Sequence, residues 1–155
     1  MKELCGDIFV ALHKQHFDAI VCTINCQVKK NGELVMGAGV AKAFAQQHPW
    51  LPLEWGKRVS KHKDNNYIHM PFITLRHQRP HFIALPTKID WQCKSDISLV
   101  AANVRQLSLM IDVLGLNSVL LPRPGCANGG LSWAKMVKPI CLEHLDERFT
   151  IISKD

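Results

Sequence analysis

The sequence of 155 residues lacks the features that mark several classes of protein. No apolar run approaches the length needed to span a bilayer, and the first residues contain no apolar signal-peptide segment. Internal repeats, linkers and low-complexity segments are also missing. These absences predict one globular domain over residues 1–155 that stays in the cytoplasm and has no membrane partner.

The six cysteines do not form CxxC pairs. Cys22 and Cys26 are the nearest two, and no second cysteine pair accompanies them to complete a four-ligand site. Several cysteines fall in apolar segments, where a free thiol behaves as a small hydrophobic side chain. The sequence therefore predicts reduced thiols in a reducing compartment, with no metal site and no cofactor.

The Walker pattern GxxxxGK[ST] is absent, which excludes a P-loop nucleotidase. Gly37-Ala38-Gly39 is similar to the start of a dinucleotide-binding fingerprint, but Lys42 stands where the third glycine of GxGxxG would fall. The residues before Gly37 are a predicted loop rather than a strand. We therefore interpret the segment as a phosphate-cradling turn that opens a short helix, which ends before His48-Pro49.

The net charge of +6 at pH 7 favours an anionic partner. Lysines and arginines are spread along the chain and form neither a basic helix nor an aromatic RNA-binding motif. Charge alone therefore indicates a phosphate-containing ligand or a nucleic acid, and leaves the choice between them open.

Hydrophobic periodicity predicts strands that alternate with helices at both ends of the chain. Residues 18–26 form a β-branched apolar run typical of a strand buried on both faces. From Ile97 to Leu114 apolar residues recur every three or four positions, which predicts a core-facing helix capped by Ser95 or Asp96 and closed by Gly115. Other expected elements are strands at 2–9, 67–76, 81–85, 118–121 and 149–152, a short surface helix between 50 and 66, and a helix from 137. The pattern indicates an α/β fold, a three-layer α/β/α sandwich with a mixed central sheet.

Residues 120–133, LLPRPGCANGGLSW, connect a predicted buried strand to a helix through three glycines. Without Cβ atoms, the backbone N–H groups of such a turn can converge on a phosphate, and the following helix would add its positive end. A tight strand-to-helix connection without a ligand explains the same glycines. Asn25 also follows an interior strand, at the edge where open α/β sheets bind ligands, although a satisfied buried amide is the alternative there.

Two stretches at the ends of predicted strands carry a family resemblance: Leu85-Pro86-Thr87-Lys88-x-x-Trp91 and Pro122-x-Pro124-Gly125-Cys126-x-Asn128-Gly129-Gly130-Leu131-x-Trp133. They resemble the macrodomain, the ADP-ribose-binding fold, and in particular its branch of DNA ADP-ribosyl glycohydrolase antitoxins and their phage or bacterial homologues. With Gly6-Asp7-Ile8, Thr23-Ile24-Asn25 and the Gly37 segment, they keep the family's order of motifs over nearly the whole chain.

The resemblance implies a role for each matching position. Asp7 would accept the adenine amino group beside Ile8, although its side chain could instead only cap a turn. Asn25, with Thr23 before it, would face the distal ribose and act there together with Lys88 in catalysis. The diphosphate would lie between two loops, one formed by Gly37, Ala38, Gly39 and Val40 and the other by Pro122, Gly125, Cys126, Ala127, Asn128 and Gly129.

Lys88 resembles the lysine on which hydrolysis depends in this branch. Cleavage at the distal ribose passes through an oxocarbenium-like state, and a neutral lysine amine can attack the opened sugar aldehyde to give a Schiff base. A neighbouring diphosphate favours the ammonium form and burial disfavours it, so phosphate binding by Lys88 stays open as an alternative. In another macrodomain branch an aspartate partners the lysine, at the position that corresponds to Gly129. This departure points to the lysine-only, DNA-type branch.

The sequence thus predicts an ADP-ribosyl glycohydrolase that removes ADP-ribose from modified nucleobases in DNA or from protein side chains. A phosphatase acting on ADP-ribose 1''-phosphate, a reader that binds ADP-ribose without turnover, and a basic nucleic-acid-binding module are the alternatives. The expected partners are ADP-ribose or an ADP-ribosylated substrate, with DNA among them, and a separate ADP-ribosyltransferase toxin. The chain itself is expected to be a monomer.

Overall fold

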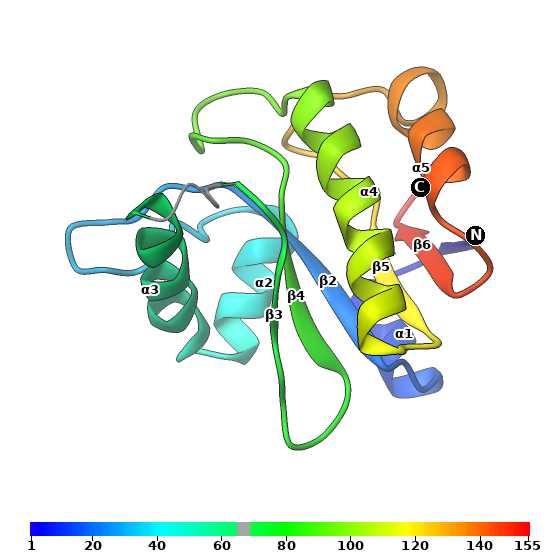
Figure 1. Ribbon diagram of the computed structural model, residues 1–155, viewed down its shortest axis with the longest axis horizontal. Helices are drawn as coiled ribbons and strands as arrows, with labels where there is room; N and C mark the ends of the chain where they lie inside the picture. The colour runs from blue at the N-terminus through cyan, green and yellow to red at the C-terminus, as the bar shows by residue number, and fades with distance from the viewer. Residues whose placement is uncertain (65–68) are drawn as a thin grey trace.

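The structure is a computed structural model that describes residues 1–64 and 69–155. Within this part of the chain, six strands form one sheet in the order β1-β6-β5-β2-β4-β3 (Figure 1). The neighbouring strands run parallel except β3 and β4, which are antiparallel. The predicted mixed sheet is confirmed. The strands are β1 (Lys2–Cys5), β2 (Ala19–Ile24), β3 (Phe72–Thr74), β4 (His81–Pro86), β5 (Val119–Pro122) and β6 (Phe149–Ser153).

Helices cover both faces of the sheet, and Figure 1 shows α2 and α3 on one side of β2 and β4 with α4 on the other. In β2, the side chains of Ile20 and Cys22 join the core beneath α2 and α3, while Val21 joins the core beneath α4. This alternation explains why the apolar run of β2 is continuous, because both of its faces are buried. The helices are α1 (Ile8–Lys14), α2 (Gly39–Gln47), α3 (Leu51–Asp64), α4 (Ile97–Leu114), the π-helical turn η1 (Trp133–Val137) and α5 (Lys138–His144).

Helix α4 begins and ends where the sequence predicts. Asp96, rather than Ser95, is its N-cap, and Oδ1 of Asp96 accepts hydrogen bonds from the N–H groups of Ser98 and Leu99. Gly115 closes the helix in the left-handed region, at φ 65°. By length and composition α4 could cross a membrane, with mean hydropathy 1.4, which corrects the expectation that no apolar run is long enough. Its apolar stripe packs on the sheet, as in the core helix of a soluble protein.

Four boundaries differ from the sequence prediction. The first strand ends at Cys5, because Asp7 caps α1 instead of extending the strand. Helix α3 is longer than expected and belongs to the core, with Trp55 fully buried. β3 covers only Phe72–Thr74 of the strand expected at 67–76, and residues 65–68 lie outside the described part of the chain. The last helical segment begins as a π-helical turn at Trp133 rather than at 137.

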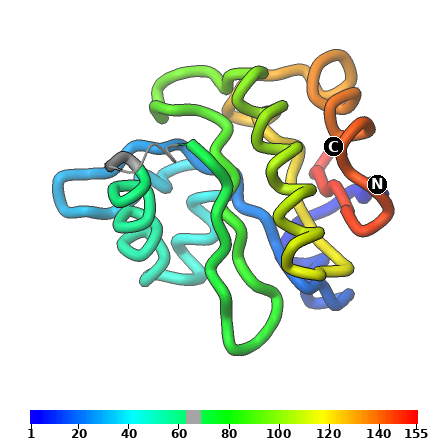
Figure 2. Tube along the Cα trace, in the orientation of Figure 1, coloured from blue at the N-terminus to red at the C-terminus, as the bar shows by residue number. Residues whose placement is uncertain are grey.

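The parallel core of the sheet brings the loops of the candidate site together. In the register, Ile24 at the end of β2 is paired with Pro86 at the end of β4, and β5 runs parallel on the other side of β2. The segments that follow β4 and β5 therefore leave the sheet at the same end (Figure 2). Ligands of open α/β sheets bind at this edge.

Candidate functional site

Two cavities at the carboxyl ends of the strands join into one groove. The Asp7 cavity, of about 570 Å³, contains Asp7 and Ile8, and the Lys88 cavity, of about 450 Å³, contains Asn25 and Lys88. Each volume lies within the range of small-molecule sites, roughly 300–1,000 Å³. The lining residues that both cavities share are Gly39, Val40, Pro122, Arg123, Cys126 and Ala127. Because these residues lie in both walls, a single elongated ligand can occupy both cavities.

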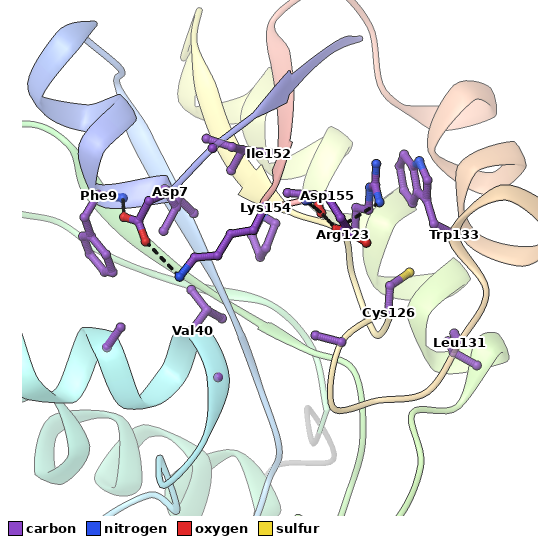
Figure 3. A pocket seen from close by; sticks show the side chains of 17 residues that line it. Asp7, Phe9, Val40, Arg123, Cys126, Leu131, Trp133, Ile152, Lys154 and Asp155 are labelled. Atoms are coloured by element: carbon purple, nitrogen blue, oxygen red, sulfur yellow. Dashed lines mark hydrogen bonds and ion pairs between the residues drawn. The ribbon is translucent and has the colours of Figure 1, made fainter.

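Asp7 lies at one end of the groove and has two sets of contacts. Its Oδ1 caps α1 by accepting hydrogen bonds from the N–H groups of Phe9 and Val10. Its Oδ2 lies 3.3 Å from Nζ of Lys154, whose side chain crosses the cavity (Figure 3). Burial alone would raise the pKa of Asp7, but the two N–H donors and the Lys154 ammonium together lower it below its ordinary value. Asp7 is therefore a carboxylate acceptor at neutral pH.

Asn25 is buried in the wall of the Lys88 cavity, and its amide is engaged by its own loop. Nδ2 donates to the carbonyl of Val35 at 2.9 Å, and Oδ1 accepts from the N–H of Gln27 at 3.0 Å. The bond to Val35 ties the segment after β2 to the segment that leads into α2, and the bond from Gln27 lies within the segment after β2. The contacts match the buried-amide alternative, while the position of the residue keeps it in the candidate site.

Lys88 and Trp91 lie together at the other end of the groove, in the loop that follows β4. Nζ of Lys88 donates to the carbonyl of Trp91 at 3.2 Å, and both residues line the Lys88 cavity. Thr87, just before the lysine, is buried, and its N–H donates to the carbonyl of Ile24 at the end of β2. The base of the loop is thus attached to the sheet, and Lys88 is half-buried at the cavity wall.

The loop from Pro122 to Gly130 presents free backbone donors to the groove. In residues 1–64 and 69–155, the N–H groups of Ala127, Asn128 and Gly129 make no backbone or side-chain hydrogen bond. Gly125 has φ 72°, in the left-handed region that a glycine adopts easily. The turn leaves its N–H groups available to an anion, as the sequence predicts.

The two glycine loops touch each other across the groove. A Cβ atom added to Gly39, which has φ 57°, would lie 2.9 Å from Nδ2 of Asn128. Gly39 also opens α2, so the first-turn N–H groups of this helix face the same space as the loop after β5. The two loops thus approach each other closely where both offer N–H groups.

Gly129 packs against the start of α4. Its carbonyl accepts a hydrogen bond from the N–H of Ser95 at 2.9 Å. A Cβ at Gly129 would lie 2.1 Å from Oγ of Ser95 and 2.4 Å from the carbonyl oxygen of Gly125. No side chain fits there without a change in the loop, so a carboxylate cannot project from this position as the loop stands.

Arg123 is a lining residue of both cavities that the sequence analysis did not single out. Its guanidinium lies over the Trp133 ring at 5.1 Å from the ring centroid, and Nη1 is 3.5 Å from Oδ1 of Asp155 (Figure 3). Nε of Arg123 is buried and has no partner among the described residues. The sequence did contain a signal for a site role of Arg123, because this residue stands between Pro122 and Pro124 in the loop that carries the family resemblance.

Several other lining residues also went unpredicted. They come mainly from β6 and the residues after it, and from the loop that precedes α4. The set comprises Gly6, Phe9, Ala43, Leu131, Trp133, Ile152, Ser153, Lys154 and Asp155 in the Asp7 cavity, and Ile24, Val35, Ala41, Thr87, Trp91 and Ser95 in the Lys88 cavity. By contrast, the structure gathers all the site residues that the sequence predicts around the one groove.

Cys126 is poorly suited to act as a nucleophile. Burial raises the pKa of its thiol to about 11, and Sγ lies 3.4 Å from the carbonyl oxygen of Pro124. A thiol with so high a pKa stays protonated near neutral pH, and the thiolate is the reactive form. Within residues 1–64 and 69–155, no three histidine, cysteine, aspartate or glutamate side chains cluster as metal ligands.

Comparisons of sequence and of structure both find known proteins that are similar to this chain. The chain is 30% identical over 119 residues to proteins named DNA ADP-ribosyl glycohydrolase from Mycobacterium bovis and Mycobacterium tuberculosis; the match covers 75% of this chain and 32% of the relatives. The solved macrodomain of Mycobacterium tuberculosis DarG superposes with a TM-score of 0.74 at 25% identity, covering 99% of this chain and 97% of that one. No model of a protein family matches the sequence.

A second solved structure has the same fold. Thermosipho africanus DarTG, solved in complex with ADP-ribose, superposes with a TM-score of 0.73 at 21% identity, covering 95% of this chain and 39% of that chain. The chain thus has the macrodomain fold, with a groove at its strand ends. Among macrodomains it is similar to those of the DNA ADP-ribosyl glycohydrolases, although it spans only about a third of the length of the curated relatives.

Proposed function

We propose that this macrodomain binds ADP-ribose along the groove and hydrolyses the bond between its distal ribose and a modified nucleobase in DNA or a protein side chain. One observation carries the proposal: the Asp7 carboxylate and the Lys88 amine lie in two adjacent cavities that share six lining residues. The names of the curated relatives support the same activity. The reaction consumes one water and yields ADP-ribose and the unmodified base or side chain.

The Asp7 cavity suits an adenosine. A carboxylate accepts hydrogen bonds only, which matches the two donors of the adenine amino group. Ile8, Phe9 and Val40 supply an apolar wall against which a planar base can pack. To use Oδ2 of Asp7, the adenine amino group would take the place that Lys154 now occupies.

The narrow middle of the groove suits a diphosphate. The unpaired N–H groups of the loop after β5 and those of the first turn of α2 lie on its two sides. Backbone donors and a helix N-terminus attract an anion together. Arg123 adds a guanidinium to the same walls, and guanidinium–phosphate pairs are strong hydrogen-bonded contacts.

In this proposal Lys88 carries out the chemical step at the distal ribose. As a neutral amine, Nζ would bond to C1'' while the glycosidic bond breaks and the departing nitrogen or oxygen takes a proton. Opening of the sugar ring would turn this adduct into a Schiff base. Water would then add at C1'', the C1''–Nζ bond would break, and free lysine and ADP-ribose would result. The present contact of Nζ with the Trp91 carbonyl would be exchanged for the substrate.

Packing at Gly129 supports a mechanism that depends on lysine without a partner carboxylate. Oγ of Ser95 and the carbonyl of Gly125 occupy the space that a side chain at position 129 would need. The two-residue mechanism of the other macrodomain branch would therefore require a different loop. Two lysines line the groove among the described residues, and Lys88 is the one in the cavity where the distal ribose would lie, whereas Lys154 lies in the Asp7 cavity.

The test compares Lys88→Ala with wild type on ADP-ribosylated single-stranded DNA and on ADP-ribosylated protein. We expect turnover to fall by about 100-fold or more, since a group that takes part in bond cleavage contributes on that order. The dissociation constant for free ADP-ribose, measured by calorimetry, should change little. Lys135→Ala, which removes an exposed lysine outside both cavities, is the matched control and should behave as wild type.

Other outcomes of this test would contradict the mechanism or identify an alternative function. Unchanged turnover in Lys88→Ala would disprove the lysine mechanism. Phosphate released from ADP-ribose 1''-phosphate without glycosidic cleavage would identify a phosphatase, and tight ADP-ribose binding without any product would identify a reader. A monomeric state, a cytoplasmic location and a separate ADP-ribosyltransferase partner remain predictions from the sequence.

A further inference from the structure

Two large apolar side chains are exposed at the mouth of the Lys88 cavity. Ile89 is 56% exposed and Trp91 is 50% exposed, and both belong to the loop between β4 and α4. Trp91 lines the cavity itself. An aromatic side chain in the wall of a binding cavity can contact a ligand that occupies the cavity.

The loop that carries Trp91 is held by hydrogen bonds at several points. Oδ1 of Asp90 accepts from the N–H of Gln92 at 2.8 Å, and the carbonyl of Asp90 accepts from the N–H of Cys93 at 3.1 Å. The carbonyl of Ile89 accepts from the N–H of Cys26 at 3.0 Å, which ties the loop to the end of β2. The indole is thus presented from an ordered turn beside the catalytic candidate.

Trp91 differs from the other three tryptophans in its surroundings. The ring of Trp55 contacts two phenylalanines, and the ring of Trp133 lies under the guanidinium of Arg123. Trp50, which is 47% exposed, stacks on Phe82 at 6.3 Å between centroids. Among the described residues, no aromatic or cationic partner lies against the ring of Trp91. The face of its ring is available to a ligand.

We propose that Trp91 determines specificity by stacking on the nucleobase attached to the distal ribose. This inference rests on the proposed function. If C1'' lies at Lys88, the group bonded to C1'' lies near Trp91, because both residues line the Lys88 cavity and the backbone carbonyl of Trp91 is 3.2 Å from Nζ of Lys88. A planar base offers a π-face to the indole, whereas an aspartate or glutamate side chain does not.

Lysines and carboxylates both stand around this mouth, since the loop after β4 contains Asp90 and Asp96 beside its two lysines. Lys94 is exposed in the same loop, and its Cδ lies 3.8 Å from the position of a Cβ on Gly130, at the outer edge of the phosphate-binding loop. The chain as a whole carries a net charge of +6. Proteins bind single-stranded nucleic acid by stacking its bases on exposed aromatic rings, with lysines or arginines near its backbone. Trp91 supplies such a ring, and Lys94 supplies a cation in the same loop.

The experiment separates recognition of the base from recognition of ADP-ribose. Trp91→Ala and Trp91→Phe are compared with wild type in binding free ADP-ribose by calorimetry, and in kcat/KM for an ADP-ribosylated single-stranded oligonucleotide and an ADP-ribosylated peptide. Trp50→Ala, which removes an indole of similar exposure far from the groove, is the matched control, with thermal melting as a check on folding. If wild type binds without turnover, the dissociation constants of the same two ligands replace kcat/KM.

We expect Trp91→Ala to reduce kcat/KM for the oligonucleotide about tenfold, chiefly through KM, because one stacked base contributes on that order. Its affinity for free ADP-ribose, which carries no base on the distal ribose, should stay within about twofold. Trp91→Phe should retain most of the activity, since a phenyl ring also stacks, and Trp50→Ala should match wild type.

Three results would overturn the role of Trp91 alone: no loss on the oligonucleotide, an equal loss on the peptide, or an equal loss of affinity for free ADP-ribose. A wild-type protein that binds ADP-ribose but cleaves or binds only the peptide would overturn it too. Failure of wild type to bind ADP-ribose at all would instead refute the proposed function, and this inference with it.

Discussion

The ammonium group of Lys154 lies 3.3 Å from Oδ2 of Asp7, and both residues line the same cavity (Figure 3). The pair joins the residue that begins α1 to the segment that follows β6. It exists because β6 pairs with β1, and the N–H of Gly6 donates to the carbonyl of Ser153 at 2.8 Å. A ligand that uses the Asp7 carboxylate must displace this lysine.

Replacement of Lys154 by methionine should therefore tighten the binding of ADP-ribose. The lysine is largely exposed, and such ion pairs are weak, so we expect the dissociation constant to fall only about twofold to threefold. Calorimetry at low and moderate salt measures the change, with Lys135→Met as a control for the lost charge. Weaker binding by Lys154→Met would show that the lysine contacts the ligand instead of competing with it.

Alanine at Gly129 should damage the phosphate-binding loop, whereas alanine at Gly37 should be tolerated. A Cβ at Gly129 would meet Oγ of Ser95 and the carbonyl oxygen of Gly125 well inside contact distance, while a Cβ at Gly37 has no neighbour within 4 Å. Overpacking of this kind costs about 1–3 kcal/mol of the free energy of unfolding. Denaturant unfolding and ADP-ribose titration of both variants test the contrast. Equal behaviour of the two would contradict the packing described for Gly129.

Cys126 should resist alkylation and be dispensable for turnover. Its thiol has a pKa raised to about 11 by burial, so it stays protonated at pH 8, whereas Cys5 and Cys93 are exposed. Treatment with iodoacetamide followed by mass spectrometry should label the two exposed thiols first. Cys126→Ala should keep its activity. Loss of turnover in this variant, with ADP-ribose binding intact, would show that the thiol takes part in the reaction.

Asp18, which lies at the end of the sheet opposite the groove, should make the free energy of unfolding depend on pH in the acid range. Burial alone would raise the pKa of this carboxyl, but the N–H groups of Asn117 and Ser118 and the Arg79 guanidinium together lower it below the ordinary value of 3.8. A depressed pKa contributes stability that is fully present above pH 3.8 and is lost as the pH falls through the lower, folded-state pKa.

The measurement is denaturant unfolding of wild type and Asp18→Asn between pH 2 and pH 7. At neutral pH the asparagine variant should be less stable by about 2 kcal/mol, because a charged acceptor of two backbone donors is lost. Its stability should then change less with pH in the acid range than that of wild type. Parallel pH profiles for the two proteins would refute this role of Asp18.

The sequence predicted the elements whose own pattern requires one structure. β2 must be apolar throughout because both faces of a central parallel strand are covered, and α4 must repeat its apolar residues at helical spacing because one stripe meets the sheet. Short elements were less certain. The sequence pattern after Cys5 fits either a strand or a helix. These residues form helix α1 because the Asp7 side chain accepts hydrogen bonds from two N–H groups in its first turn.

The helix α3 shows the limit of reasoning from composition. Its many charges indicated the surface, yet Trp55 is fully buried between Phe44 and Phe72, and its Nε1 donates to Oγ1 of Thr74 at 2.9 Å. A helix with one strongly apolar stripe enters the core however charged its outer face is. The residues against which this apolar stripe packs lie elsewhere in the chain, so only the tertiary structure shows that α3 belongs to the core.

The sequence by itself determined the α/β alternation, the two glycine loops and the place of Lys88 after a buried strand, because each depends on residues close together in the chain. Tertiary structure alone decided that Arg123, Trp91 and Lys154 share a groove with them. These residues meet through the parallel pairing of strands far apart in sequence, and no local pattern encodes which strands become neighbours.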